Sequence, residues 1–129
     1  MILDTEKIEF ELKSKLAGVA DSIHTSVPDT RVKDKSFIVV SVDSSVIDEF
    51  AYYYTITSVQ IFVPNLATGE KNSAMFTKII DAINRILPEE YSLVSGIYEF
   101  EMLPKIIPLG NDNKGYFIKE IQIKTIIHK

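Results

Sequence analysis

The sequence predicts an α+β fold, a two-layer sandwich in which two helices pack on one face of a mostly antiparallel sheet. Two stretches carry apolar residues at three-to-four-residue spacing, which is the spacing of one helix face. Four other stretches are rich in β-branched and aromatic residues, as strands are. The predicted order is α–β–β–α–β–β, and two amphipathic helices need one apolar sheet face to cover.

Size and composition predict a single domain. The chain has 129 residues, a common length for one domain. Its residues are 46% hydrophobic and 25% charged, as in ordinary globular proteins. No segment departs from this composition, so we expect residues 1–129 to form one domain without a linker.

The first helix is predicted over residues 4–23. Asp4 or Thr5 is a suitable N-cap. Phe10 lies off the apolar stripe, so it either widens the core face or makes an exposed contact, and the core position is favoured. The stripe itself consists of Ile8, Leu12, Leu16, Val19 and Ile23.

Two strands are predicted in the next segment. Residues 36–42 are dense in β-branched residues, which suggests a central strand covered on both faces. Residues 43–51 form a polar connection with an apolar tip. A long strand follows over 52–63 and begins with three tyrosines, 52–54. Because strand side chains alternate between faces, cross-strand packing is favoured over one tyrosine patch.

The second half of the chain is predicted to hold one helix and two strands. Residues 64–72 form a loop, and Asn72 or Ser73 caps a helix over 73–87 that Pro88 ends. A strand over residues 93–103 follows, with a bulge at Gly96.

A loop over 104–115 contains Pro104, Pro108 and a Gly-Asn-Asp-Asn-Lys-Gly turn. The turn leads into a last strand, 116–127, as the second arm of a hairpin. The strands near 52–63 and 116–127 exceed the usual strand length. Long strands that project beyond a small core need a partner, which is a hint of assembly.

The charge distribution argues against a nucleic-acid-binding surface. The net charge is −4, whereas such a surface needs clustered Lys and Arg. Residues 1–51 carry more acids than bases, and residues 101–129 carry more bases than acids. This imbalance suits a head-to-tail contact, although an ordinary solvated surface is the favoured explanation.

The compartment is predicted from three features. The chain has no cysteine, which excludes disulfides and thiol chemistry. Its first residues lack the basic and apolar regions of a signal peptide. No apolar stretch approaches the length of a membrane span. We therefore expect folding in a reducing cytoplasm, with no membrane contact.

The sequence predicts no catalytic, cofactor or metal site. His24 and His128 lack the spacing of a metal pair and are expected to be surface residues. Asp43, Asp48 and Glu49 lack the oxygen spacing of a calcium loop, so acids of solvated turns are favoured over a cation site. Glu99 and Glu101 share one strand face, where an exposed or assembly role is favoured over paired-carboxylate catalysis. We therefore expect a protein that is not an enzyme.

The pattern of elements resembles that of phage tail terminator (tail completion) proteins. The resemblance rests on the helical start, the strands at 37–42 and 55–63, and the loop and helix at 72–87. It covers nearly the whole chain, as a succession of elements and lengths rather than a motif.

The resemblance implies a structural role. Such proteins form rings, often hexameric, that cap the tail tube and join the head connector. It implies assembly in the host cytoplasm, presence in the virion, a phage or prophage origin and no sequence-specific nucleic-acid binding. The contacting loops correspond to 43–51, 64–72 and 104–115. The candidate contact residues are Asp43, Asp48, Glu49, Phe50, Asn65, Leu66, Glu70, Lys71, Lys105, Asn111 and Lys114.

A different class of function also fits the sequence. A small non-catalytic binding module would recognise a peptide or ligand, either by sheet-edge addition or in a pocket near the tyrosines at 52–54.

Overall fold

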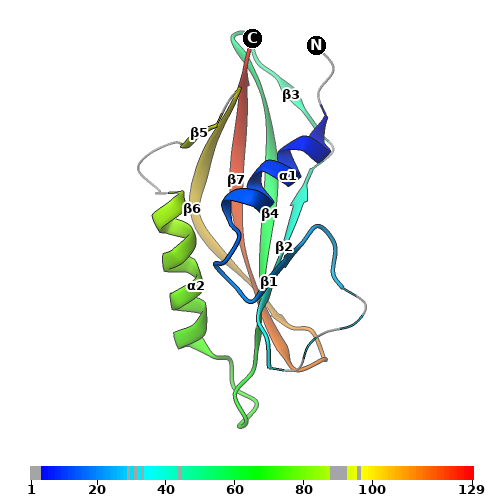
Figure 1. Ribbon diagram of the computed structural model, residues 1–129, viewed down its shortest axis with the longest axis vertical. Helices are drawn as coiled ribbons and strands as arrows, with labels where there is room; N and C mark the ends of the chain where they lie inside the picture. Colours follow the sequence, from blue (N-terminus) through cyan, green and yellow to red (C-terminus); the bar gives the residue numbers. More distant parts are fainter. Residues whose placement is uncertain are drawn as a thin grey trace.

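The computed structural model describes residues 4–28, 30, 32, 34–43, 45–87, 93–95 and 97–129. The fold is α+β, as predicted, with two helices and a mostly antiparallel sheet (Figure 1). The elements in order are α1 (Thr5–Lys15), β1 (Ser22–His24), β2 (Phe37–Val42), β3 (Ile47–Asp48), β4 (Tyr52–Pro64), α2 (Ser73–Ile86), β5 (Leu93–Ser95), β6 (Tyr98–Asn111) and β7 (Tyr116–His128).

The described strands form one seven-stranded sheet in the order β1-β2-β4-β7-β6-β5. The short strand β3 pairs with β4 beyond the end of β2. Only the β1–β2 pair is parallel among these strands. The central pair is β4 and β7, which stay in unbroken antiparallel register from Tyr52↔His128 to Pro64↔Tyr116.

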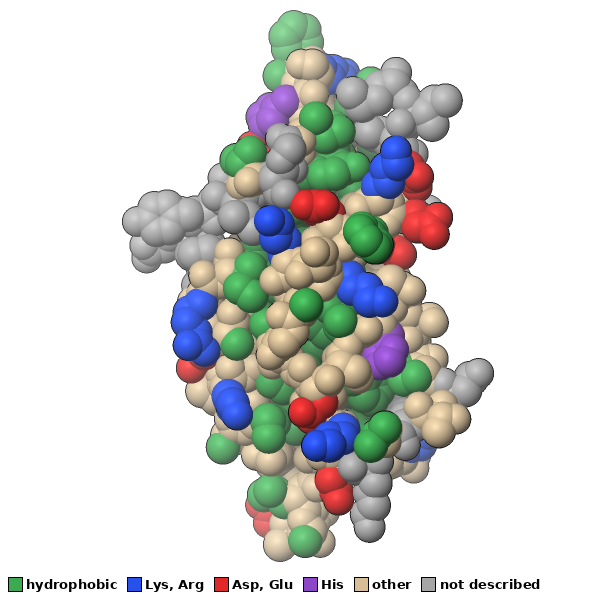
Figure 2. Space-filling view, viewed as in Figure 1, with side chains coloured by type: hydrophobic (Ala, Val, Ile, Leu, Met, Phe, Trp, Pro, Cys, Tyr) green, Lys and Arg blue, Asp and Glu red, His purple; other side chains and the backbone are tan. Residues whose placement is uncertain are grey.

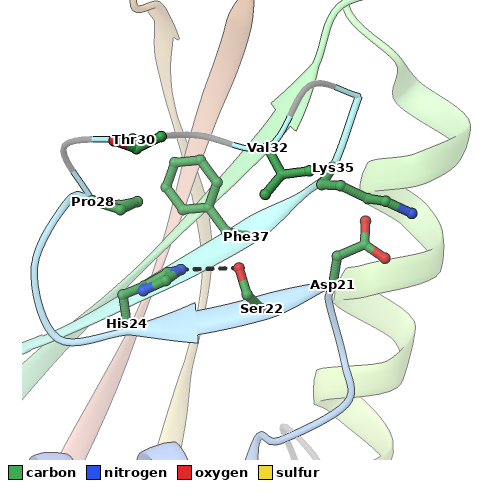
Figure 3. A pocket seen from close by; sticks show the side chains of 8 residues that line it. All are labelled: Asp21, Ser22, His24, Pro28, Thr30, Val32, Lys35 and Phe37. Atoms are coloured by element: carbon green, nitrogen blue, oxygen red, sulfur yellow. Dashed lines mark hydrogen bonds between the residues drawn. The ribbon is translucent and has the colours of Figure 1, made fainter.

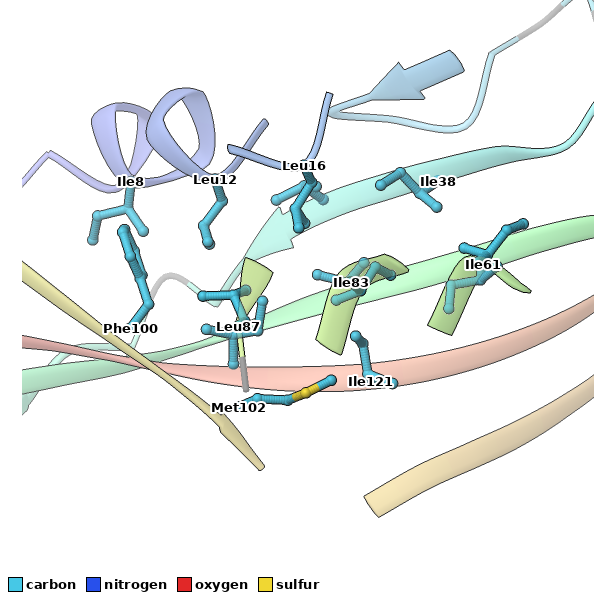
Figure 4. Packing of buried hydrophobic residues seen from close by; sticks show 14 of the residues in the cluster. Ile8, Leu12, Leu16, Ile38, Ile61, Ile83, Leu87, Phe100, Met102 and Ile121 are labelled. Carbon is cyan, nitrogen blue, oxygen red and sulfur yellow. The ribbon is translucent and has the colours of Figure 1, made fainter. Parts of the chain in front are cut away.

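The main core lies between both helices and one face of the sheet. The amphipathic stripe of α1 contributes Ile8 and Leu12, and α2 contributes Ile79 and Ile83. They pack on inward-facing residues of the central strands, among them Val59, Ile61, Ile121 and Ile123 (Figure 4).

The opposite face of the sheet carries a smaller buried cluster. Phe37 and Phe62 stack there with ring centroids 4.5 Å apart, and Tyr116 packs beside Phe37 at 5.5 Å. The Tyr116 hydroxyl donates to the backbone carbonyls of Val32 and Lys35, which holds the segment between β1 and β2 over this cluster. Strand β2 is therefore buried on both faces over its first four residues, as predicted.

The first helix is shorter than predicted. Asp4 caps it by accepting from the Glu6 amide, but the helix ends at Lys15 rather than at residue 23. Gly18 follows with φ of +89°, a left-handed conformation that ends helices. Residues 22–24 then pair with β2 as strand β1, and this tertiary pairing overrides the helical spacing of Val19 and Ile23.

The strand predicted over residues 93–103 is instead two strands. β5 and β6 pair antiparallel, with Ser95 opposite Tyr98, so the chain reverses where a bulge was expected. Gly96 itself and Pro88 lie outside the described residues.

The loop predicted over 104–115 is wrong for most of its length. β6 continues through both prolines to Asn111, with register shifts between Met102 and Ile106 and between Pro108 and Gly110. Irregular pairing lets a strand contain prolines, which lack an N–H donor for the ladder. Only the turn before Tyr116 remains, and it forms the predicted hairpin.

Candidate assembly surfaces

The candidate contact residues lie mainly at two opposite ends of the sheet. Strand β4 runs from one end to the other, with the 43–51 segment near its start and the 64–72 loop after its last residue (Figure 1). Sequence reasoning located these two loops correctly. It did not predict that they lie at opposite ends.

The first end, which we call the β3 tip, comprises residues 45–51, which include strand β3, and carries two acids and the exposed apolar side chains of Ile47 and Phe50. Phe50 is 100% exposed, and Asp48 and Glu49 precede it. The Glu49 amide donates to the Tyr52 carbonyl over 2.9 Å, and the Lys129 amide donates to the Ala51 carbonyl over 3.1 Å. Asp48 also forms an ion pair with Lys129. These bonds fix the backbone on both sides of Phe50.

Asp43 lies near the β3 tip but serves the local backbone. Its carboxylate accepts from the Ser45 amide over 2.8 Å, and its amide donates to the Ile56 carbonyl over 2.9 Å. These are the contacts of a turn residue.

The other end, which we call the lower end, combines the 64–72 loop with the β6–β7 turn. The Asn65 side-chain amide donates to Asn111 over 2.9 Å, and the Asn65 backbone amide donates to Gly115 over 2.8 Å. Two segments that are far apart in sequence are thereby joined. The candidate residues that gather here are Asn65, Leu66, Glu70, Lys71, Asn111 and Lys114.

Lys105 belongs to neither end. It lies on β6 and is exposed, within the first register shift, between Met102 and Ile106. Ile106 and Leu109 are each 47% exposed on the same strand. The sequence placed Lys105 in a loop, because two nearby prolines are typical of loops.

The sheet face opposite the helices is partly aromatic. Tyr52 and Tyr54 share this face with ring centroids 6.2 Å apart, whereas Tyr53 packs against the main core. The Lys124 ammonium lies 4.5 Å from the Tyr54 ring centroid and 5.7 Å from that of Tyr52. The predicted alternation is confirmed, and the cross-strand contact is with a lysine.

A cavity of about 400 Å³ opens on this face at the β1 edge of the sheet (Figure 3). The mostly buried Phe37 side chain lines it from the sheet, and Pro28 and Val32 line it from the residues between β1 and β2. His24 and Lys35 add polar groups to its lining. No spacing in the sequence signalled this cavity, because its walls come from a strand pair and a segment that folds back over it.

Phe10 is exposed, which contradicts the favoured core position. Its side chain is 71% exposed because it lies two residues from Ile8, on the far side of a helix turn. A hollow of about 390 Å³ separates α1 from Tyr98 beside it. Burial, and then the nearby carboxylates of Asp4 and Glu11, raise the pKa of the Tyr98 hydroxyl above its ordinary value.

Both histidines have partners. The His24 Nε2 lies 2.9 Å from the Ser22 hydroxyl, and the His128 Nε2 lies 2.7 Å from a Glu99 carboxylate oxygen. His24 is also half-buried, with an edge-to-face contact of 5.8 Å to Phe37, so it is not a plain surface residue. Within the described ranges, no three acidic or imidazole side chains gather as metal ligands do.

The face drawn in Figure 2 and the character of the helices both bear on possible surroundings. Figure 2 shows Lys, Arg, Asp and Glu side chains interspersed over the face seen there, with hydrophobic side chains at its upper extremity. Among the described residues, neither helix has the length and apolar character needed to cross a membrane.

Comparisons with known proteins bear on the fold. No family model matches the sequence, and no curated protein matches it significantly. One similar solved chain carries only an identifier as its name; it is 12% identical, with a TM-score of 0.61, and the match covers 100% of this chain and 97% of that one. A second comes from a structure described as the virion of a native gene transfer agent particle. It is 11% identical, with a TM-score of 0.55, over 92% of this chain and 85% of that one. At these identities the likenesses show that this chain shares their fold.

Proposed function

We propose that this protein is a structural component of a phage or prophage particle, a ring-forming tail terminator that caps the tail tube and joins the head connector. The observation that carries the proposal is the shared fold with a chain from a gene transfer agent virion, over most of both chains. The resemblance in element order and length points to the same class of protein.

The two-ended architecture supports this role. A terminator must contact the tail tube on one side and the head connector on the other. The β3 tip and the lower end of this chain lie at opposite ends of the β4–β7 strand pair, and both carry exposed loop residues. One end therefore serves each neighbour, while the flanks of the sheet serve other copies in a ring such as a hexamer.

The proposed role is non-catalytic and needs no cofactor. It places the protein in the host cytoplasm during assembly and in the finished virion, without membrane contact or sequence-specific nucleic-acid binding. The net charge of −4 suits a channel wall that DNA passes without adhering.

The test is a tube-capping assay with the tail tube protein of the same genome. Polymerising tube subunits are incubated with and without this protein, and tube lengths and ends are observed by electron microscopy. We expect shorter tubes with added density at one end. Unchanged tube lengths and bare ends at a large molar excess would contradict the proposal.

The alternative is a monomeric binding module. The observation that favours it is the cavity of about 400 Å³ beside Phe37, a size that small-molecule and side-chain ligands occupy. Saturable binding of a small ligand by a monomer, with shifts confined to His24 and its neighbours in NMR spectra, would support it.

A further inference from the structure

We propose that the hollow between α1 and Tyr98 receives an arginine side chain of the protein that lies against the β3 tip in the assembled particle. This contact rests on the proposed function, since it names the chemistry of one of the two axial neighbours. The hollow has a volume of about 390 Å³. It joins three features that otherwise lack a role: an exposed phenyl ring, a half-buried tyrosine and an excess of carboxylates.

The hollow lies at the same end of the molecule as the β3 tip. Tyr98 of β6 stands opposite Ile127 of β7, and Ile127 stands opposite Tyr53 of β4. Tyr53 in turn stands opposite Asp48 of β3, so these residues form one row across the sheet. Helix α1 lies in the half of the molecule that holds β3 (Figure 1). The row spans three strand spacings, about 14 Å, which is within the footprint of an ordinary protein contact.

Two aromatic rings give the hollow its apolar walls. Phe10 lines it from α1 and is 71% exposed, and Tyr98 lines it from β6. The Tyr98 ring stacks on the buried Phe100 ring with centroids 6.0 Å apart, so the core fixes its position. A guanidinium group is planar and stacks on aromatic faces. The two rings therefore offer an arginine side chain surfaces to lie against.

The lining of the hollow is predominantly acidic. It holds three carboxylates, those of Asp4, Glu6 and Glu11, against one ammonium group, that of Lys7. Burial raises the pKa of the Tyr98 hydroxyl, and the Asp4 and Glu11 carboxylates raise it further, which places both near this ring. An excess of negative charge attracts a cation and repels the phosphates of nucleic acid and anionic lipid. The occupant is therefore a basic segment of a protein.

Helix capping does not use up these acids. Asp4 accepts from the Glu6 amide through one carboxylate oxygen, over 3.1 Å. The Glu6 side chain is exposed, and within the described chain its carboxylate has no hydrogen-bond or ion-pair partner. A guanidinium group has five N–H donors, enough for both carboxylates while its flat face lies on Phe10.

The first experiment measures binding of N-acetyl-arginine amide by NMR, through the ring resonances of Phe10 and Tyr98, at neutral pH and low salt. The neutral isostere N-acetyl-citrulline amide is the ligand control. We expect saturable shifts with the arginine probe and none with citrulline. Added salt should weaken the binding, because it screens the attraction between exposed charges.

The variants Phe10→Ala and Glu6→Gln remove one wall and one carboxylate of the hollow. We expect each to weaken binding of the arginine probe by about two- to fivefold, the value of one exposed cation–π contact or ion pair. The matched controls bind as wild type: Phe50→Ala removes an exposed phenyl ring outside the hollow, and Glu70→Gln removes an acid of the lower end. Thermal unfolding shows that each variant is folded.

The partner is tested with the tail tube protein and the head-connector protein of the same genome. We expect Phe10→Ala and Glu6→Gln to weaken binding of only one of the two, since only one lies against the β3 tip. Replacing the contacting arginine of that protein by glutamine should reproduce the loss. Unchanged binding of both neighbours would overturn the docking of an arginine in the hollow.

Three results with the small probes would also overturn the proposal. They are no saturable shift with arginine, equal binding of citrulline, and undiminished arginine binding in both Phe10→Ala and Glu6→Gln. In each case the tube-capping assay still decides the proposed function separately. Conversely, a wild type that binds the arginine probe but leaves tail tubes uncapped would keep the arginine site and lose the terminator role.

Discussion

Three threonines lie under the helices at the centre of the sheet, and their hydroxyl groups differ in hydrogen bonding. Thr55 Oγ1 lies 3.0 Å from the carbonyl oxygens of Asp43 and Ser45. Thr57 and Thr125 are fully buried, and their Oγ1 atoms have no hydrogen-bond partner within the part of the chain that the structure describes. A buried hydroxyl without a partner carries a desolvation cost that is not repaid.

We therefore expect Thr57→Val to stabilise the protein. Valine has the same shape and β-branching, and it removes the unbonded hydroxyl, so the free energy of unfolding should rise by about 1 kcal/mol. Chemical denaturation measures this difference. The slope of the unfolding free energy against denaturant concentration should be the same in both proteins. A midpoint at lower denaturant than that of wild type would show that the hydroxyl has a partner in solution.

The matched control is Thr55→Val, which makes the same change where the hydroxyl is bonded. It removes the donor to the Asp43 and Ser45 carbonyls, so the free energy of unfolding should fall by about 1 kcal/mol. The diagnostic result is a change in the free energy of unfolding that is positive for Thr57→Val and negative for Thr55→Val.

At the residue scale the sequence could predict positions on a strand but not exposure. The alternation of Tyr52, Tyr53 and Tyr54 was predicted because it follows from strand geometry alone. The exposure of Phe10 was not predicted. A phenylalanine beside the apolar stripe of a helix fits either a wide or a narrow core face. Only the tertiary packing on α1 decides between them.

Among the elements, α1 is followed by a left-handed glycine, Gly18, two residues after its C-cap Leu16. We expect Gly18→Ala to lower the free energy of unfolding by about 1 kcal/mol, because φ of +89° is unfavourable for residues with a Cβ. No atom would meet that Cβ within 4 Å, so the loss comes from the backbone alone. Gly18→Asn, which tolerates positive φ, should cost less. Equal thermal unfolding of wild type and the alanine variant would contradict this.

Strand β6 has an outer edge that β5 covers only at residues 98–100. Its two prolines interrupt the remaining row of N–H donors and discourage pairing with another chain. We expect the double variant Pro104→Thr, Pro108→Thr to aggregate at lower concentration, with increased thioflavin fluorescence. Pro64→Thr, at the end of a central strand, is the control. Identical aggregation of the double variant and wild type would show that the prolines do not protect this edge.

The elements themselves were largely predictable where pattern and length agree. The long strands β4 and β7 and the helix α2 follow from alternation, helical spacing and the Asn72 cap, whose side chain accepts from Met75. The strands β1 and β3 were missed and β5 was merged with β6, because two or three residues carry no periodic signal and pair only in the folded chain.

For the whole molecule, the sheet order predicts a gradient of local stability. β4 and β7 pair on both sides along most of their length, whereas β1, β3 and β5 lie at the margins of the sheet. We expect hydrogen–deuterium exchange to be slowest at 55–63 and 117–126 and fastest at the β3 tip. Comparable exchange in all seven strands would contradict this order.

The candidate surfaces were predictable as loops but not as a three-dimensional arrangement. Composition identified 43–51 and 64–72, since polar and turn-forming residues concentrate there. Their separation to opposite ends depends on β4 running the full length of the sheet. The cavity beside Phe37 depends on Val32 and Lys35 being held over β2 by the Tyr116 hydroxyl, a tertiary contact with no local signature.

The unbroken β4–β7 pairing has a mechanical consequence. Thirteen residues of β4 in continuous register correspond to a stiff rod of about 40 Å at the usual rise per residue. Within the described chain, no bulge interrupts this pair, so a push on one extremity is transmitted to the other without bending. Under the proposed role, such a rod would act as a spacer between the layers above and below it in the particle.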